Sequence, residues 1–229
     1  DRADAVLYAF HGGTMQGTAL ANLIMGKVAP SGRLPMTFPM GEGQIPFYYN
    51  YKTPSRLMAK SPKLINDIPI RAYQFSVGES SYWLEYGNKP QYPFGYGLTY
   101  TTFEYGPVVL SDTCLNASSP DHLVASCEIA NTGNRDAVAV PQLYIRDVVG
   151  SLTRPIRELK GFQRVEIPAG ETRTVTFELT EEDLAYWHLA EGASLGSAGQ
   201  YAFSAEKGDF HVWIAPNAAE GEPAKFTLK

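Results

Sequence analysis

The 229-residue sequence contains only two cysteines, and its formal net charge is only -5. Proteins that bind nucleic acid or anionic membranes present a basic surface, so this small acidic excess argues against either as the main partner. No apolar run approaches the ~20 residues that span a bilayer. With 44% hydrophobic residues, the composition indicates a globular protein that can bury a core.

The residue patterns of several enzyme classes are also missing. The histidines show no metal-ligand spacing, and the sequence has no phosphate-binding loop and no Ser-His-Asp signature. The histidines are His11, His122, His188 and His211. We therefore expect no metal and no cofactor.

Cys114 and Cys127 are 13 residues apart, and the turn-like stretch NASSPD lies between them. This arrangement suits a disulfide between two neighbouring strands, and it equally suits two free thiols. The spacing is not that of a metal site. Both states of the cysteines stay open at this point.

The chain begins with a pattern typical of a strand followed by a helix. Residues 5–10 form the continuous apolar run AVLYAF, which is typical of a buried parallel strand. A lone parallel strand has nothing to pair with, so we expect the N-terminal part of a larger protein to precede it or to lie on another chain. The turn HGGT then leads into a helix, with Thr14 or Thr18 as the expected N-cap and Gly26 at its end.

The pattern changes twice after the helix. Residues 40–97 show no sustained period, and such a long irregular stretch is rare unless it wraps a surface or serves a site. From about residue 107, short alternating segments such as LVASCEIAN, TRTVTFEL and DFHVWIAP are separated by turns. Short strands at this spacing are typical of an antiparallel β-sandwich of immunoglobulin or fibronectin type III kind.

We therefore expect two units, residues 1–106 and residues 107–229, and we expect Trp187 and Trp213 in the core of the sandwich. The stretch QYPFGYGLTYTTFEY, residues 91–105, connects the two units and is crowded with aromatic rings. A fully enclosed ring buries some 150–250 Å². These rings are expected to staple the two units together, and the glycines allow sharp turns between them.

Five motifs in this sequence, taken together, closely resemble the C-terminal part of glycoside hydrolase family 3: GGTMQGTALANLIMG, PSGRLPMTFP, GQIPFYYN, QYPFGYGLTYTTFEY and RPIRELKGFQRV. The resemblance covers essentially the whole chain and is strongest to the β-glucosidase and β-xylosidase branch. It implies an α/β plus all-β protein. Residues 1–106 would be the C-terminal part of an α/β sandwich domain with a long wrapping segment, and residues 107–229 a fibronectin type III-like (immunoglobulin-like) β-sandwich.

The resemblance also implies an exo-acting retaining β-glycosidase, which uses a carboxylate nucleophile and a second carboxylic acid as acid/base. The nucleophile would lie on a (β/α)8 barrel and the acid/base before Asp1, so we expect no catalytic residue here and no activity from this chain alone. The implied partners are the N-terminal portion of the same enzyme, on this chain or a separate one, and an oligosaccharide or aryl β-glycoside. Proteins of the family are usually periplasmic or secreted, and a homodimer stays open.

Four residues are the candidate contacts with the sugar. Trp83 and Tyr86 lie in the irregular segment, as do Tyr48, Tyr49 and Tyr51, and such rings could stack on a sugar. Thr14 and Met15 lie in the loop that follows the first expected strand, where open α/β sheets bind ligands. The alternatives are that the rings pin the long loop to its domain and that HGGTMQG is a structural turn.

Two other functions stay open. The chain could be a non-catalytic fibronectin-like module for glycan adhesion or oligomer contacts, or a structural fragment without a function of its own. Folding of residues 107–229 alone together with glycan binding would favour the first. An accompanying second chain of roughly 500 residues, the size that the family resemblance implies, would favour the enzyme.

Overall fold

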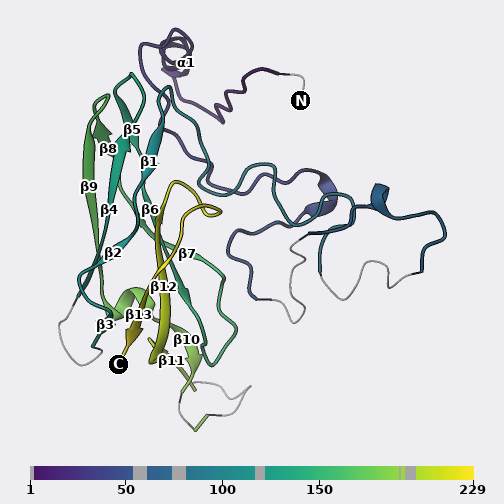
Figure 1. The fold of residues 1–229 in the computed structure, drawn as a ribbon, viewed down its shortest axis with the longest axis vertical. Coiled ribbons are helices and arrows are strands. Elements are labelled where there is room, and N and C mark those ends of the chain that lie inside the picture. Colours follow the sequence, from purple (N-terminus) through teal and green to yellow (C-terminus); the bar gives the residue numbers. More distant parts are fainter. Residues whose placement is uncertain (1–2, 54–60, 74–80, 117–121, 191, 194–199) are drawn as a thin grey trace.

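The computed structural model describes residues 3–53, 61–73, 81–116, 122–190, 192–193 and 200–229. A tall β-sandwich dominates the molecule, with helix α1 (Gln16–Ile24) at one end and a long segment extending to one side (Figure 1). That segment contains two short 3-10 helices, η1 (Glu42–Gln44) and η2 (Ile65–Asp67).

The sandwich is built from two main sheets. In the first, β4 pairs with β9 on one edge and with β1 and β2 in succession on the other. The second has the order β3-β13-β12-β6-β7. The strands of the first sheet are β1 (Phe103–Tyr105), β2 (Val109–Leu110), β4 (Leu123–Asn131) and β9 (Thr172–Leu179). Those of the second are β3 (Cys114–Leu115), β6 (Gln142–Asp147), β7 (Glu158–Phe162), β12 (Gly208–Ala215) and β13 (Ala224–Leu228).

Two small antiparallel pairs and one short helix complete the sandwich. The pairs are β5 (Ala137–Ala139) with β8 (Val165–Ile167), and β10 (Tyr186–Leu189) with β11 (Tyr201–Ser204). Helix α2 (Glu181–Leu184) connects β9 to β10. Because β10 and β11 pair with each other and with no other described strand, they form a separate hairpin.

The main core lies between the two sheets, as the alternating pattern predicts. Strand β4 covers the whole stretch LVASCEIAN, and Ala125 and Ile129 on its inner face are fully buried. From the other sheet, Phe210 and Phe226 stack at 5.4 Å between ring centroids. Each buried side chain of this kind stabilises the fold by ~1.5–3 kcal/mol, so the sandwich has a core of its own.

Trp213 is buried as expected, but outside the main core. It lies on the opposite face of the second sheet with Tyr144, where Phe94 and Tyr49 cover it. Tyr49 stacks on Phe94 at 4.1 Å, and its hydroxyl accepts a hydrogen bond from the amide of Leu159. The hinge segment 91–105 therefore staples the two units together, as its rings predict.

Arg157, from the motif RPIRELKGFQRV, packs at the same place. The Arg157 guanidinium lies 4.3 Å from the centre of the Trp213 ring and donates hydrogen bonds to the carbonyls of Ala218 and Glu220. Burial lowers the pKa of Arg157 from its ordinary value. The arginine thus fixes the turn after β12 against the sheet, in a fork geometry that lysine does not have.

Two expectations about the first part need correction. Residues 5–10 form no strand, because no strand in the described part of the chain pairs with them. Val6 and Tyr8 are accordingly 74% and 57% exposed. Helix α1 ends at the expected place, with Gly26 at a φ of +67°. Its N-cap, however, is Met15, so neither expected threonine caps it with a side-chain oxygen.

One expectation about the sandwich is also wrong, and of the two states left open for the cysteines the structure has free thiols. Trp187 is 65% exposed, because it points outward from β10. Cys114 and Cys127 are free thiols, because β3 pairs with β13 in one sheet while β4 belongs to the other. The Cys127 thiol instead donates to the carbonyl of Gly106, and burial raises its pKa.

The boundary near residue 106 stays a prediction, and β1 allows a sharper test of it. Phe103 and Tyr105 pack against the main core although they precede the expected boundary. We expect residues 107–229 to fold as a β-rich monomer with a cooperative melt. Residues 101–229 should melt roughly 5–10 °C higher, because they add a strand and two half-buried rings. Circular dichroism of both fragments decides this: an unfolded spectrum from 107–229 would move the boundary upstream.

Candidate functional site

The candidate site is an aromatic hollow in the long side segment. Its volume is about 370 Å³, within the range of ~300–1,000 Å³ that is typical of small-molecule sites. The hollow is lined by Pro46, Phe47, Tyr48, Tyr51, Lys52, Ser81, Tyr82 and Trp83.

Two stretches far apart in the sequence run side by side to form this region. Phe38 and Tyr92 form an isolated antiparallel β-bridge. The side-chain amide of Gln44 joins the two stretches further along. Gln44 is fully buried; its Oε1 accepts the amide of Met40 at 2.7 Å, and its Nε2 donates to the carbonyl of Lys89 at 3.2 Å. These bonds hold the segment in place without regular secondary structure.

Trp83 lies half-buried in one wall of the hollow. Its indole stacks on Phe47 with ring centroids 4.9 Å apart and an interplanar angle of 20°. The tight turn beneath it places Gly87 at a φ of +72°, where the Gly87 amide donates to the carbonyl of Trp83 at 2.7 Å. A side chain at position 87 would be strained there, so glycine is required to shape this wall.

Tyr51 and Lys52 form the wall that touches the sandwich. The Tyr51 carbonyl accepts the amide of Ile156 at 3.0 Å, and Lys52 bridges to Pro155. Burial raises the pKa of Tyr51, so its hydroxyl stays protonated and can donate a hydrogen bond. The hollow therefore combines aromatic faces with polar groups, the combination that suits the C–H faces and hydroxyls of a sugar.

The four candidate sugar contacts do not come together. Of these, Trp83 alone is among the residues that line the hollow. The Tyr86 ring packs over Gly41, where a Cβ would come within 2.4 Å of it. Thr14 and Met15 lie in the loop that precedes α1, outside the hollow, with Met15 67% exposed. Sequence reasoning found Tyr48 and Tyr51 but missed Phe47 and Tyr82, which only the pairing of distant stretches brings in.

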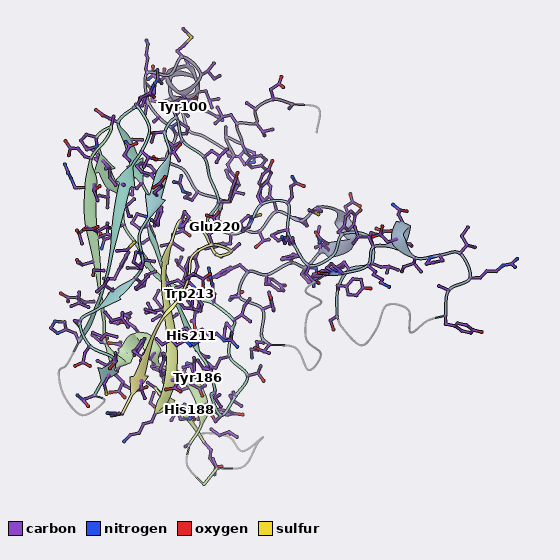
Figure 2. The ribbon with its side chains drawn as sticks, viewed as in Figure 1. Tyr100, Tyr186, His188, His211, Trp213 and Glu220 are labelled. Atoms are coloured by element: carbon purple, nitrogen blue, oxygen red, sulfur yellow. The ribbon has the colours of Figure 1, made fainter. Side chains whose placement is uncertain are left out.

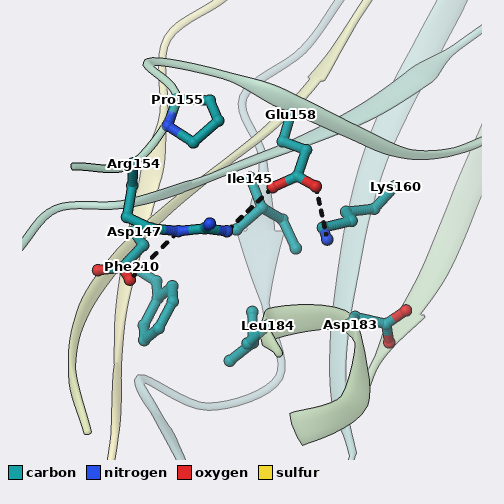
Figure 3. Close-up of a pocket in the computed structure, with 9 residues that line it drawn as sticks. All are labelled: Ile145, Asp147, Arg154, Pro155, Glu158, Lys160, Asp183, Leu184 and Phe210. Atoms are coloured by element: carbon teal, nitrogen blue, oxygen red, sulfur yellow. Dashed lines mark hydrogen bonds and ion pairs between the residues drawn. The ribbon is translucent and has the colours of Figure 1, made fainter. Parts of the chain in front are cut away.

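A second cluster, of charged residues, lies in the sandwich (Figure 3). Arg154 is 3.2 Å from Glu158 and 3.8 Å from Asp147, and Lys160 is 3.2 Å from Glu158. Burial raises the pKa of Asp147, although Arg154 opposes that shift. The space between these residues is about 10 Å³, room for one water at most. These carboxylates form a structural ion network and do not bind a sugar.

Comparison with known proteins explains the two parts of the chain. Residues 1–100 match the glycosyl hydrolase family 3 C-terminal domain, and residues 139–218 match the fibronectin type III-like domain. The chain belongs to glycoside hydrolase family 3. This confirms the family and both parts of the fold that the five motifs predict.

Relatives in the family are identical to this chain at about a third of the aligned positions. The periplasmic beta-glucosidase of Salmonella typhimurium is 35% identical over 99% of this chain, and a beta-xylosidase of Formosa agariphila is 36% identical over 79%. A Listeria innocua beta-glucosidase, solved in complex with isofagomine, matches 94% of this chain with a TM-score of 0.74 and 32% identity. The chain spans only 26% of the Salmonella protein, 22% of the Formosa protein and 27% of the Listeria chain.

Proposed function

We propose that this chain is the C-terminal part of an exo-acting retaining β-glycosidase, a β-glucosidase or β-xylosidase, and that it completes the domain bordering the active site. The aromatic hollow around Trp83 is the observation that carries the proposal. It supplies a sugar-sized space with stacked rings in a chain whose relatives are named β-glucosidases and β-xylosidases. The substrate would be an oligosaccharide or an aryl β-glycoside.

The partner in this proposal is the N-terminal portion of the same enzyme. None of the residues Gln16–Ile24 of helix α1 is buried, and Ile24 and Met25 are 71% and 72% exposed. Val6 and Met15, at 74% and 67%, are also exposed apolar side chains in this part of the chain. Exposed apolar patches of this kind mark interaction sites, and a family 3 relative has some three quarters of its length available to cover this one. That portion would also supply both catalytic carboxyl groups.

Export to the periplasm or outside the cell belongs to the same proposal. It is supported by the Salmonella relative, which is named a periplasmic enzyme. No helix in the described part of the chain is long and apolar enough to cross a membrane. A homodimer of the complete enzyme stays a prediction that light scattering tests.

Trp83→Ala in the complete enzyme is expected to raise KM for oligosaccharides roughly tenfold, because a stacking surface in the hollow is lost. Its melting temperature should change little, since the indole is only half-buried. Leu84→Ala is the matched control: the neighbouring side chain is 38% exposed and does not line the hollow. A lower melting temperature with unchanged kinetics for Trp83→Ala would show that the ring only pins the loop.

A further inference from the structure

The outer face of the β10–β11 hairpin is apolar on both strands. Trp187 lies opposite Phe203, and Leu189 lies opposite Tyr201. Trp187, Phe203 and Tyr201 are 65%, 52% and 49% exposed, and the first two rings lie 5.4 Å apart. An antiparallel sheet with one face in water normally turns polar side chains outward. This face does the opposite, which marks it as a binding surface.

The inner face of the hairpin is fixed by polar contacts, so the outer face is held in one register. The buried Tyr186 hydroxyl donates to Glu206, and the Arg154 guanidinium lies 3.9 Å from the centre of the Tyr186 ring. His188 Nε2 lies 2.8 Å from the hydroxyl of Ser204 across the strand pair. A one-residue slip would break all of these contacts and turn the aromatic face inward. Figure 2 shows Tyr186 and His188 close together at this end of the sandwich.

The hairpin lies far from the apolar surface around α1. The apolar surface that the N-terminal portion would cover includes residues 6–25. The hairpin lies at the opposite end of the sandwich from α1 (Figure 1). The outer face of the hairpin is therefore a second apolar surface, apart from the one around α1.

The size of the surface argues against a second copy of the chain. If a fully enclosed ring buries ~150–250 Å², three rings that are about half exposed have roughly 300 Å² of accessible surface together. A stable protein interface needs about 800 Å² on each partner. The surface suits a narrower ligand that touches a few rings, and the absence of charged side chains from both outward pairs suits a neutral one.

We propose that the outer face of the β10–β11 hairpin binds a neutral β-linked polysaccharide chain. The choice of β-linked sugars rests on the proposed function. Rings of β-linked glucose or xylose present C–H bonds on their flat faces, and Trp187, Phe203 and Tyr201 present exposed aromatic faces to meet them. The site would hold the complete enzyme on a polymer while the active site works on chain ends.

The test is native gel electrophoresis of the complete enzyme through gels that contain mixed-linkage β-glucan or xylan. The wild-type enzyme should be retarded, and Trp187→Ala should weaken the apparent affinity roughly tenfold, as loss of a central aromatic contact does. Phe162→Ala is the matched control, because Phe162 is 63% exposed on β7, outside the hairpin. Its retardation should equal that of the wild type.

Equal retardation of Trp187→Ala and the wild type would overturn the inference. So would a dimer, seen by light scattering, that Trp187→Ala dissociates, because the occupant would then be a second copy. If Trp187→Ala fails to fold, Tyr201→Ala at the other outward pair gives the same test. Hydrolysis of a nitrophenyl glycoside, measured separately, should be equal in all variants. An enzyme that binds the polymer but hydrolyses no β-glycoside would refute the proposed function and leave this inference standing.

Discussion

The 229-residue chain alone is expected to release no nitrophenol from a β-glucoside or a β-xyloside. Retaining hydrolysis needs two carboxyl groups ~5–5.5 Å apart across the glycosidic bond, held in precise geometry. No position in this sequence matches either catalytic motif of the family. The carboxylates of the sandwich cluster, Asp147 and Glu158, face cations in a space too small for a sugar.

Addition of the separately produced N-terminal portion is expected to restore hydrolysis. The exposed residues of α1 and the apolar segment before it give that portion a surface to pack against. The measurement is nitrophenol release by each piece and by the mixture. Turnover by the isolated chain that disappears when one of its own carboxylates is mutated would refute the expectation. It would place a catalytic pair inside these residues.

Gln142→Leu is expected to destabilise the chain by roughly 3 kcal/mol, or about 6–12 °C in melting temperature. Gln142 is 3% exposed. Its Nε2 donates to the carbonyls of Gly95 and Pro216 at 3.0 and 2.7 Å, and its Oε1 accepts the hydroxyl of Tyr144 at 2.5 Å. Leucine fills a similar volume but leaves three buried polar groups without this partner, and each costs about 1–3 kcal/mol.

The matched control for this variant is Gln163→Leu. Gln163 also donates a side-chain hydrogen bond, to the carbonyl of Thr176 at 2.6 Å, but at a site that water reaches. Its loss should change stability by no more than about 0.5–1 kcal/mol. Thermal melts followed by circular dichroism compare the two variants. If both variants lost the same amount of stability, the hydrogen bonds of Gln142 would not hold the hinge to the sandwich.

The sequence predicts the sandwich well where the information is local. Strand β9 occupies the whole stretch TRTVTFEL, and its alternate residues Val175, Phe177 and Leu179 are buried, because side chains in a strand alternate between two faces. The end of α1 just before Gly26 is equally local, since glycine adopts a positive φ without strain.

The same alternation cannot tell which face of a strand is covered. Trp187 and Trp213 both stand in alternating segments, yet one is exposed and the other buried. Trp213 is buried because the hinge folds over the outer face of its sheet, whereas no described element covers the outer face of the hairpin that carries Trp187. Periodicity shows which residues share a face, and long-range packing decides what lies against it.

The sequence by itself determined the family, the two-part architecture, most of the sandwich strands and the stapling role of the hinge rings. These follow from ordered motifs, period-two alternation and turn residues, all of which act over short distances along the chain. Tertiary structure alone decided that the cysteines lie on different sheets and that Phe47 stacks on Trp83. It also decided that residues 5–10 form no strand here. Each depends on which distant segment lies alongside, and a strand or a ring gains its stabilising contacts only from such a neighbour.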